Sequence, residues 1–170
     1  MEVAQLNDHS IQASYQQLAM HYDHEYAVVW CYMRPVSRPC VTPELLAEIR
    51  QLQCAVEQQV RNDHLKGGPQ GLRYQVLASR TPGVFSLGGD LTLFLEAIRG
   101  QDRDGLFRYA KSCIDMLYNT AVSYNLPVTT ISLVQGEALG GGFEAALASN
   151  VLIAERRAQM GLPEILFNMF

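Results

Sequence analysis

A chain of 170 residues, of which 48% are hydrophobic and 18% charged, is long enough for one globular domain with its own core. Its net charge of -4 gives no reason to expect a nucleic acid as partner, and its apolar stretches are too short to span a bilayer. The first residues lack the basic and apolar regions of a signal peptide, so the cytoplasm is the default location. We expect residues 1–13 to form a polar N-terminal segment and residues 14–170 to form the domain.

The first half of the domain predicts a hairpin, a helix and a third strand. Residues 14–21 and 25–33 are two strand-like runs around a turn at 22–24, and the second run is apolar on both faces, as in a central strand. Thr42 and Pro43 are typical of a helix start. The helix then carries an apolar stripe made of Leu45, Ile49, Leu52, Val56 and Val60. A turn at 66–71 leads to a strand at 73–79.

A glycine-rich stretch, G-V-F-S-L-G-G-D, occupies residues 83–90 between that strand and a helical run that begins at Leu91. One interpretation is a helix-capping turn with Asp90 as the cap. Ser86 does not lie in a Gly-x-Ser-x-Gly elbow, which argues against a serine nucleophile. After a charged break at 99–105, a long helix is indicated by Leu106, Ala110, Cys113, Leu117 and Ala121.

A second glycine-rich stretch, Gly140 to Gly142, follows an apolar strand at 129–135 and precedes the helical run F-E-A-A-L-A-S. Three glycines in a row are typical of a sharp bend or of a backbone that meets a ligand closely. The order strand, glycines, helix leaves backbone N–H groups free at the start of the helix. Such a place suits an anion, or an oxygen that becomes anionic during a reaction.

Two carboxylates belong to this part of the chain. Glu144 lies in the first turn of the predicted helix, and Glu164 follows a short strand candidate at 150–154 and a turn at 155–158. The chain has room to go away and return, so the two could face one site. The alternatives are a first-turn acid that complements the helix dipole, for Glu144, and a first-turn residue of a helix opened by Pro163, for Glu164.

The sequence gives little support for a nucleotide-binding loop, a disulfide framework or a metal site. The alternation of strands and helices predicts an α/β fold with crossover connections. Neither a P-loop nor a Gly-x-Gly-x-x-Gly motif is present. The cysteines form no Cys-x-x-Cys pair and fit free thiols. His21 and His24 could be metal ligands, but surface positions at a turn explain them better, so we expect neither a metal nor a bound cofactor.

Together these motifs resemble the crotonase (enoyl-CoA hydratase/isomerase) superfamily over about residues 14–170. F-S-L-G-G-D is similar to the first oxyanion segment of that family, Q-G-E-A-L-G-G-G-F-E to the second, and M-G-L-P-E-I to its second glutamate motif. The whole pattern is most similar to the diffusible-signal-factor synthases, which make cis-2-unsaturated fatty acids for bacterial cell–cell signalling. The resemblance implies a spiral of strand–strand–helix repeats, with the C-terminal helical part of that fold missing from this chain.

Carried over to this sequence, the resemblance implies an oxyanion hole made by Gly89 and Gly141 and an acid/base pair made by Glu144 and Glu164. It also implies contacts with the substrate at Phe85, Ser86, Leu87, Gly88 and Gly140. The implied reaction is dehydration of a 3-hydroxyacyl thioester to a cis-2-enoyl thioester, followed by hydrolysis that releases the fatty acid.

Two departures from the family bear on the substrate. Ser86 stands where the synthases carry asparagine, which changes the local polarity. Gly83 and Val84 stand where many coenzyme-A-binding relatives carry a basic residue, so acyl carrier protein is a plausible carrier beside coenzyme A. Acyl carrier protein is acidic, so its docking site should be basic, although a solvated helix face is the favoured explanation of the candidate residues. These basic residues are Arg99, Arg103, Arg108 and Lys111.

The alternative functions are an ordinary enoyl-CoA hydratase or isomerase of fatty-acid metabolism, and a non-catalytic protein of the same fold that binds a regulatory partner. The resemblance further implies a trimer-based homo-oligomer for the full-length protein. The end of the chain is expected to leave apolar surface uncovered, which favours association. Its apolar residues are Leu166, Phe167, Met169 and Phe170.

Overall fold

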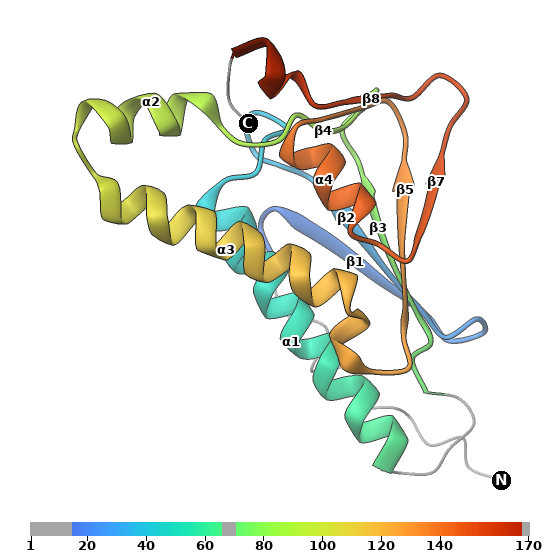
Figure 1. Ribbon diagram of the computed structural model, residues 1–170. Coiled ribbons are helices and arrows are strands. Elements are labelled where there is room, and N and C mark those ends of the chain that lie inside the picture. The colour runs from blue at the N-terminus through green and yellow to red at the C-terminus, as the bar shows by residue number, and fades with distance from the viewer. Residues whose placement is uncertain (1–14, 66–70, 168–170) are drawn as a thin grey trace, which may run out of the picture.

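The computed structural model describes residues 15–65 and 71–167, which form two sheets with helices around them (Figure 1). The expected polar segment 1–13, residues 66–70 of the expected turn, and Met169 and Phe170 lie outside the described residues. The larger sheet has the strand order β1-β2-β3-β5-β7, and the smaller sheet has the order β4-β6-β8. The strands are β1 (Leu18–Asp23), β2 (Val28–Met33), β3 (Tyr74–Ser79), β4 (Val84–Ser86), β5 (Thr129–Val134), β6 (Glu137–Leu139), β7 (Val151–Ala154) and β8 (Gln159–Gly161).

From β3 onward, each repeat adds one strand to the larger sheet, one to the smaller sheet, and then a helical segment. The helical segments are α1 (Pro43–Leu65), α2 (Leu91–Arg99), α3 (Arg103–Ala121), η2 (Ser123–Asn125), α4 (Gly141–Leu147) and η3 (Pro163–Phe167). All neighbouring strands run parallel except β1 and β2. This arrangement confirms the predicted α/β spiral of strand–strand–helix repeats. The helices α2 and the first half of α3 project away from both sheets (Figure 1).

The predicted hairpin is confirmed, but its turn lies at residues 24–27 instead of 22–24. Asp23 explains the shift, because its Oδ1 atom accepts hydrogen bonds from the N–H groups of Glu25 and Tyr26, at 3.0 and 3.2 Å. Ala27 then takes a positive φ of 54° before β2 begins. As expected for a run that is apolar on both faces, β2 lies between two other strands.

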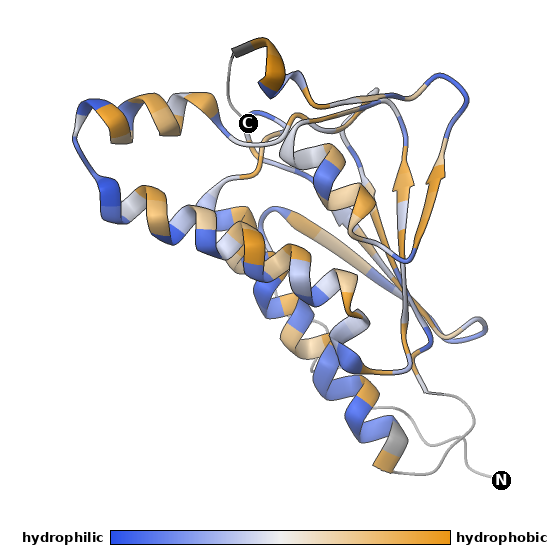
Figure 2. Cartoon of the chain, in the orientation of Figure 1, coloured by the Kyte–Doolittle hydropathy of each residue, from blue (hydrophilic) through white to orange (hydrophobic). Residues whose placement is uncertain are grey.

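The helix α1 confirms its predicted stripe, since Leu45, Leu52 and Val56 are buried in the core. Figure 2 shows the polar residues of the same helix on its outer side. Gln53 is also buried and joins α1 to α3, because its Nε2 atom donates to the carbonyl oxygen of Met116 at 3.0 Å. The middle of α1 and the C-terminal half of α3 are thereby held side by side.

Three short strands were not predicted, and all three belong to the smaller sheet. Each of β4, β6 and β8 has three residues, too few for alternation of apolar and polar side chains to become visible. The glycine turns therefore follow β4 and β6, not the longer strands β3 and β5 as the sequence suggested. The predicted helix at Pro163 is a 3₁₀ helix of five residues.

None of the helices in the described part of the chain is long and apolar enough to cross a membrane. The four cysteines are free thiols, and burial raises the pKa of Cys31 to about 12. His21 and His24 are exposed, and the described residues contain no cluster of His, Cys, Asp or Glu that could hold a metal ion. Apolar side chains of β7 and η3, among them Ile153 and Leu166, are exposed, but the expected association stays a prediction.

Candidate functional site

The first glycine turn follows β4 and is shaped by Gly88. This residue has a φ of +79°, a conformation that only glycine adopts without strain, and its N–H donates to Ser86 Oγ at 3.2 Å. Its carbonyl oxygen accepts a hydrogen bond from the N–H of Val41 at 2.7 Å. The next residue, Gly89, lies at the wall of a large cavity.

The second glycine turn follows β6 and leads directly into α4. Gly140 has a φ of +52°, and its carbonyl oxygen accepts hydrogen bonds from the N–H groups of Phe143 and Glu144 at 2.9 and 3.0 Å. Gly141 is therefore the first residue of the helix, where the backbone N–H has no partner within the helix.

The two turns are in contact. A Cβ atom at position 88 would lie 2.8 Å from the nitrogen of Gly141, and a Cβ atom at position 141 would lie 3.8 Å from the nitrogen of Gly89. Among the described residues, neither of these two nitrogens donates a hydrogen bond to another backbone group. Two free N–H groups from distant parts of the sequence thus lie beside each other.

Both predicted carboxylates lie against the second turn. The Oε2 atom of Glu144 would be 3.8 Å from a Cβ atom at position 141. The Oε1 atom of Glu164 packs so closely on Gly140 that a Cβ atom there would overlap it, and its Oε2 atom is buried without a hydrogen-bond partner in the described chain. The expectation that the two carboxylates could face one site is therefore met in the structure.

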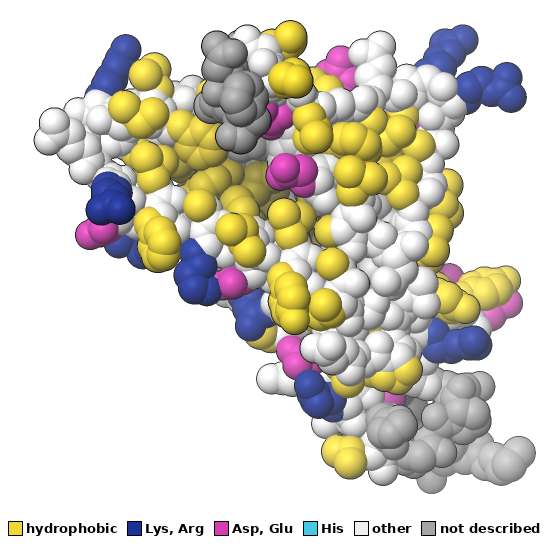
Figure 3. Space-filling view, in the orientation of Figure 1, with side chains coloured by type: hydrophobic (Ala, Val, Ile, Leu, Met, Phe, Trp, Pro, Cys, Tyr) yellow, Lys and Arg dark blue, Asp and Glu magenta, His cyan; other side chains and the backbone are white. Residues whose placement is uncertain are grey.

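A cavity of about 720 Å³ connects these groups, with Gly89, Gly141, Glu144 and Glu164 in its wall. The rest of the wall is almost entirely apolar and comes from α2, α3 and Val41. The apolar residues include Leu91, Phe94, Leu95, Ile98, Leu106, Ala110, Ile114, Met116 and Leu117. Figure 3 shows hydrophobic side chains gathered over the hollow between α2 and α3, with acidic side chains at its border.

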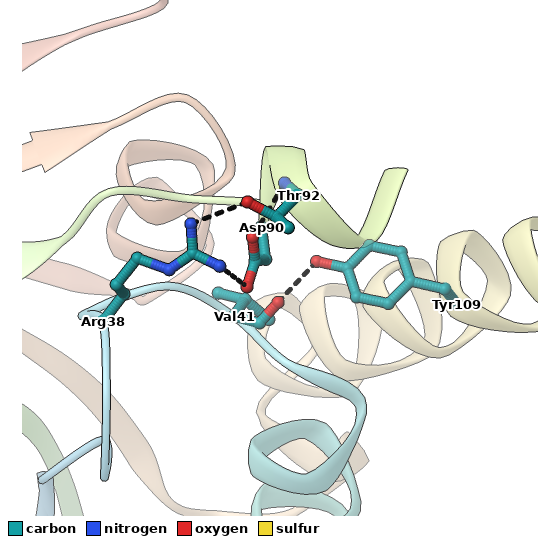
Figure 4. A network of polar contacts seen from close by, with 5 residues as sticks. All are labelled: Arg38, Val41, Asp90, Thr92 and Tyr109. Carbon is teal, nitrogen blue, oxygen red and sulfur yellow. Dashed lines mark hydrogen bonds and ion pairs between the residues drawn. The ribbon is translucent and has the colours of Figure 1, made fainter. Parts of the chain in front are cut away.

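The polar side chains of the α3 wall are Tyr109 and Cys113. The Tyr109 hydroxyl donates to the carbonyl oxygen of Val41 at 2.7 Å (Figure 4). Its ring meets the Phe94 ring edge to face, with the ring centroids 5.3 Å apart. Burial raises the pKa of both Tyr109 and Cys113, and for Cys113 it outweighs the hydrogen bond with Tyr109, which acts in the opposite direction. Both groups are therefore neutral at physiological pH.

A second set of contacts in Figure 4 surrounds the start of α2. Asp90 caps this helix, because its Oδ1 atom accepts from the N–H of Thr92 at 2.9 Å, as the capping interpretation predicted. Arg38 reaches both residues, with Nη2 2.9 Å from Asp90 Oδ2 and Nη1 2.8 Å from Thr92 Oγ1. These contacts tie the segment before α1 to the first glycine turn.

Residues 47–170 match the enoyl-CoA hydratase/isomerase family. The chain belongs to this family. The predicted membership in the crotonase superfamily is thereby confirmed, and the glycine turns and glutamates described above all lie within the matched residues.

Two proteins with similar sequences are both named as CoA hydratases. The chain is 39% identical over 93 residues to the human mitochondrial methylglutaconyl-CoA hydratase, which covers 55% of this chain and 25% of that protein. It is 32% identical over 131 residues to a probable mitochondrial enoyl-CoA hydratase 2 of Arabidopsis thaliana, which covers 77% of this chain and 38% of that protein.

Similarity to solved structures confirms the fold. Pseudomonas aeruginosa AtuE superposes with a TM-score of 0.75 at 26% identity and covers 91% of this chain. Pseudomonas aeruginosa DspI superposes with a TM-score of 0.64 at 22% identity and covers 99% of this chain. The chain spans 54% and 59% of these two proteins, so it corresponds to about half of the length of its solved relatives.

The predicted site residues take different places in this family member. Gly89, Gly141, Glu144 and Glu164 line the cavity. Among the predicted substrate contacts, Phe85 and Ser86 are buried beneath the first turn, Leu87 is 37% exposed, and Gly88 and Gly140 form the bends themselves. Their contact with a substrate stays a prediction.

Sequence reasoning missed the contribution of α3 to the site. Its stripe indicated a long helix and no part of the site, yet Leu106, Cys113 and Leu117 line the cavity. An apolar stripe on a helix reports that one face avoids water, but it does not distinguish a core from an apolar cavity. No sequence signal marked Tyr109 or Val41.

Proposed function

We propose that the cavity binds an acyl thioester with its carbonyl oxygen between the N–H groups of Gly89 and Gly141. Of Glu144 and Glu164, one then takes a proton from C2, the carbon atom next to that carbonyl group, and the other exchanges a proton with the 3-hydroxyl group. The observation that supports this most directly is the presence of two free N–H groups and two carboxylates in the wall of one apolar cavity.

The proposed reaction is the reversible loss of water from a 3-hydroxyacyl thioester. One carboxylate removes a proton from C2, and the resulting enolate oxygen is stabilised by the two N–H groups. The other carboxyl group gives a proton to the departing 3-hydroxyl group, so that a C2–C3 double bond forms and water leaves. Addition of water follows the same path in reverse.

The shape of the cavity suits an acyl chain. A volume of about 720 Å³ is large enough for an alkyl chain of moderate length. The walls from α2 and α3 offer such a chain apolar contacts in place of water. Low polarity around the two N–H groups also strengthens their interaction with an oxygen that gains negative charge.

We further propose dehydration as the physiological direction, with acyl carrier protein as the carrier and with hydrolysis of the cis-2-enoyl thioester as the last step. In hydrolysis, the oxygen of water bonds to the carbonyl carbon, the carbon–sulfur bond breaks, and the carrier leaves as a thiol. The support is the similarity of F-S-L-G-G-D and M-G-L-P-E-I to the diffusible-signal-factor synthases.

The deciding experiment incubates the protein in deuterated water with 3-hydroxyacyl thioesters of both carriers and follows the products by mass spectrometry. We expect deuterium at C2, a 2-enoyl product, and a free fatty acid from the acyl carrier protein substrate. An enoyl thioester without free acid would favour an ordinary hydratase. Absence of both exchange and dehydration would favour the non-catalytic alternative.

The basic residues near the α2–α3 connection provide a test of the carrier. Arg99, Arg103 and Arg108 are exposed, and basic side chains gather along the outer side of α3 in Figure 3. Lys111 is partly neutralised, because its Nζ atom lies 2.6 Å from Asp115 Oδ2.

Charge reversal at two of these positions, Arg103→Glu and Arg108→Glu, is expected to raise the KM for the acyl carrier protein substrate several-fold at low salt. The difference from wild type should shrink in high salt, because salt screens charges at the surface. Steady-state kinetics at several salt concentrations measure this, with the coenzyme A substrate as control. Unchanged kinetics at low salt would argue for a solvated helix face.

A further inference from the structure

Each of the two free N–H groups belongs to a peptide unit whose carbonyl group is hydrogen-bonded. That hydrogen bond sets the direction in which the N–H group points. A peptide unit is planar and trans, so its C=O and N–H groups point in opposite directions. The C=O of Gly140 and the N–H of Gly141 share one unit, and the C=O of Gly88 and the N–H of Gly89 share another. Whatever holds either carbonyl group therefore sets the direction of the N–H group behind it.

The two peptide units are held in unequal ways. The Gly140 carbonyl oxygen accepts two hydrogen bonds, from Phe143 and Glu144, within the first turn of its own helix. The Gly88 carbonyl oxygen accepts a backbone hydrogen bond from Val41, which lies in a different part of the sequence, just before α1. The direction of the Gly89 N–H group thus depends on the position of Val41.

Val41 is itself held from the cavity wall. Its carbonyl oxygen accepts a hydrogen bond from the hydroxyl group of Tyr109 at 2.7 Å (Figure 4). The Tyr109 ring packs edge to face against Phe94. Burial keeps the Tyr109 phenol protonated, so it remains a donor. The neighbouring contact of Arg38 with Asp90 is weaker support, because the Arg38 side chain is 56% exposed.

Building on the proposed function, we propose that Tyr109 is a positioning residue for the oxyanion hole. Its hydroxyl group fixes Val41, Val41 fixes the Gly88–Gly89 peptide unit, and this unit presents the Gly89 N–H group to the thioester oxygen. Tyr109 thereby links α3, which forms the wall for the acyl chain, to the group that stabilises the enolate. In this role its hydroxyl group acts through Val41 and not on the reacting atoms.

The test is Tyr109→Phe, which removes the hydroxyl group and keeps the ring against Phe94. We expect kcat for dehydration to fall about 2- to 10-fold, the usual effect of one neutral hydrogen bond, with KM changed less than 2-fold. The effect falls on kcat because the oxygen gains its charge only in the transition state. Tyr118→Phe is the matched control, since Tyr118 lies on the same helix, is 60% exposed and does not line the cavity.

A second measurement needs no substrate. In protein labelled with ¹⁵N, Tyr109→Phe should shift the amide resonance of Gly89 and speed the hydrogen exchange of the Val41 amide, and leave the Gly141 resonance in place. Unchanged Gly89 and Val41 amides would overturn the proposal whatever kcat does. A shifted Gly89 amide with wild-type kcat would overturn it as well. If the wild-type protein proved inactive, the proposed function would fail, and the amide data would still decide whether Tyr109 positions Gly89.

Discussion

Replacing either carboxylate with its amide, Glu144→Gln or Glu164→Gln, is expected to lower the rate of dehydration by about 10²–10⁴-fold, the usual contribution of general acid–base catalysis. The amide keeps the size and the hydrogen-bonding capacity of the side chain but cannot exchange a proton. Both side chains line the cavity at its glycine turns, and neither forms an ion pair within the described residues. The fold should therefore survive each change.

The measurement is the steady-state rate with a 3-hydroxyacyl thioester, together with exchange of the C2 proton in deuterated water. Glu155→Gln is the matched control, because Glu155 is exposed in the turn between β7 and β8 and lies outside the cavity wall. The double variant should be little slower than the slower single variant, since residues that act as a unit are not additive. Near-wild-type dehydration in both folded single variants would remove the central part of the proposed function.

Measuring dehydration and hydrolysis separately should also distinguish the roles of the two carboxylates. Hydrolysis of a thioester needs one base for water and an oxyanion hole, whereas dehydration needs an acid and a base. With a 2-enoyl thioester supplied directly, hydrolysis should therefore be more sensitive to one of the two changes than to the other.

Much of this site could be predicted because its parts have local causes. The run Gly140 to Gly142 predicted a bend, and in the structure each of the three glycines has a different role. Gly140 carries the positive φ, Gly141 leaves its N–H free, and Gly142 packs so tightly on Ser86 that a Cβ atom would lie 2.7 Å from the Ser86 Cβ atom. Similarly, the stripe of α1 follows from helical periodicity, which is a property of a single segment.

The parts that could not be predicted depend on contacts between distant segments. Glu164 reaches Gly140 only because β7 and β8 carry the chain to the larger sheet and back, and β8 is too short to show a pattern. Tyr109 and Val41 meet across a long stretch of sequence, and nothing in either neighbourhood indicates the other. Local periodicity contains no information about which helix face meets which turn.

The second large effect is expected from Gly88→Ala, which should lower the rate of dehydration by about 10²–10³-fold, as loss of one oxyanion donor does. At φ +79° any side chain is strained, and the new Cβ atom would lie 2.8 Å from both the Gly141 nitrogen and the Leu139 oxygen. Because both of these are backbone atoms, the two glycine turns would have to move apart. The thioester oxygen could then no longer contact both N–H groups.

Gly83→Ala separates this collision from the backbone strain. Gly83 has a similar φ of +72°, but no atom lies within 4 Å of its Cβ position, so alanine there meets the strain without the collision. We expect both variants to lose about 1–2 kcal/mol of unfolding free energy from the strain alone, and only Gly88→Ala to lose its activity. Chemical denaturation and dehydration kinetics on the two variants measure the two effects. A folded Gly88→Ala protein within tenfold of the wild-type rate would show that the contact between the glycine turns does not shape the oxyanion hole.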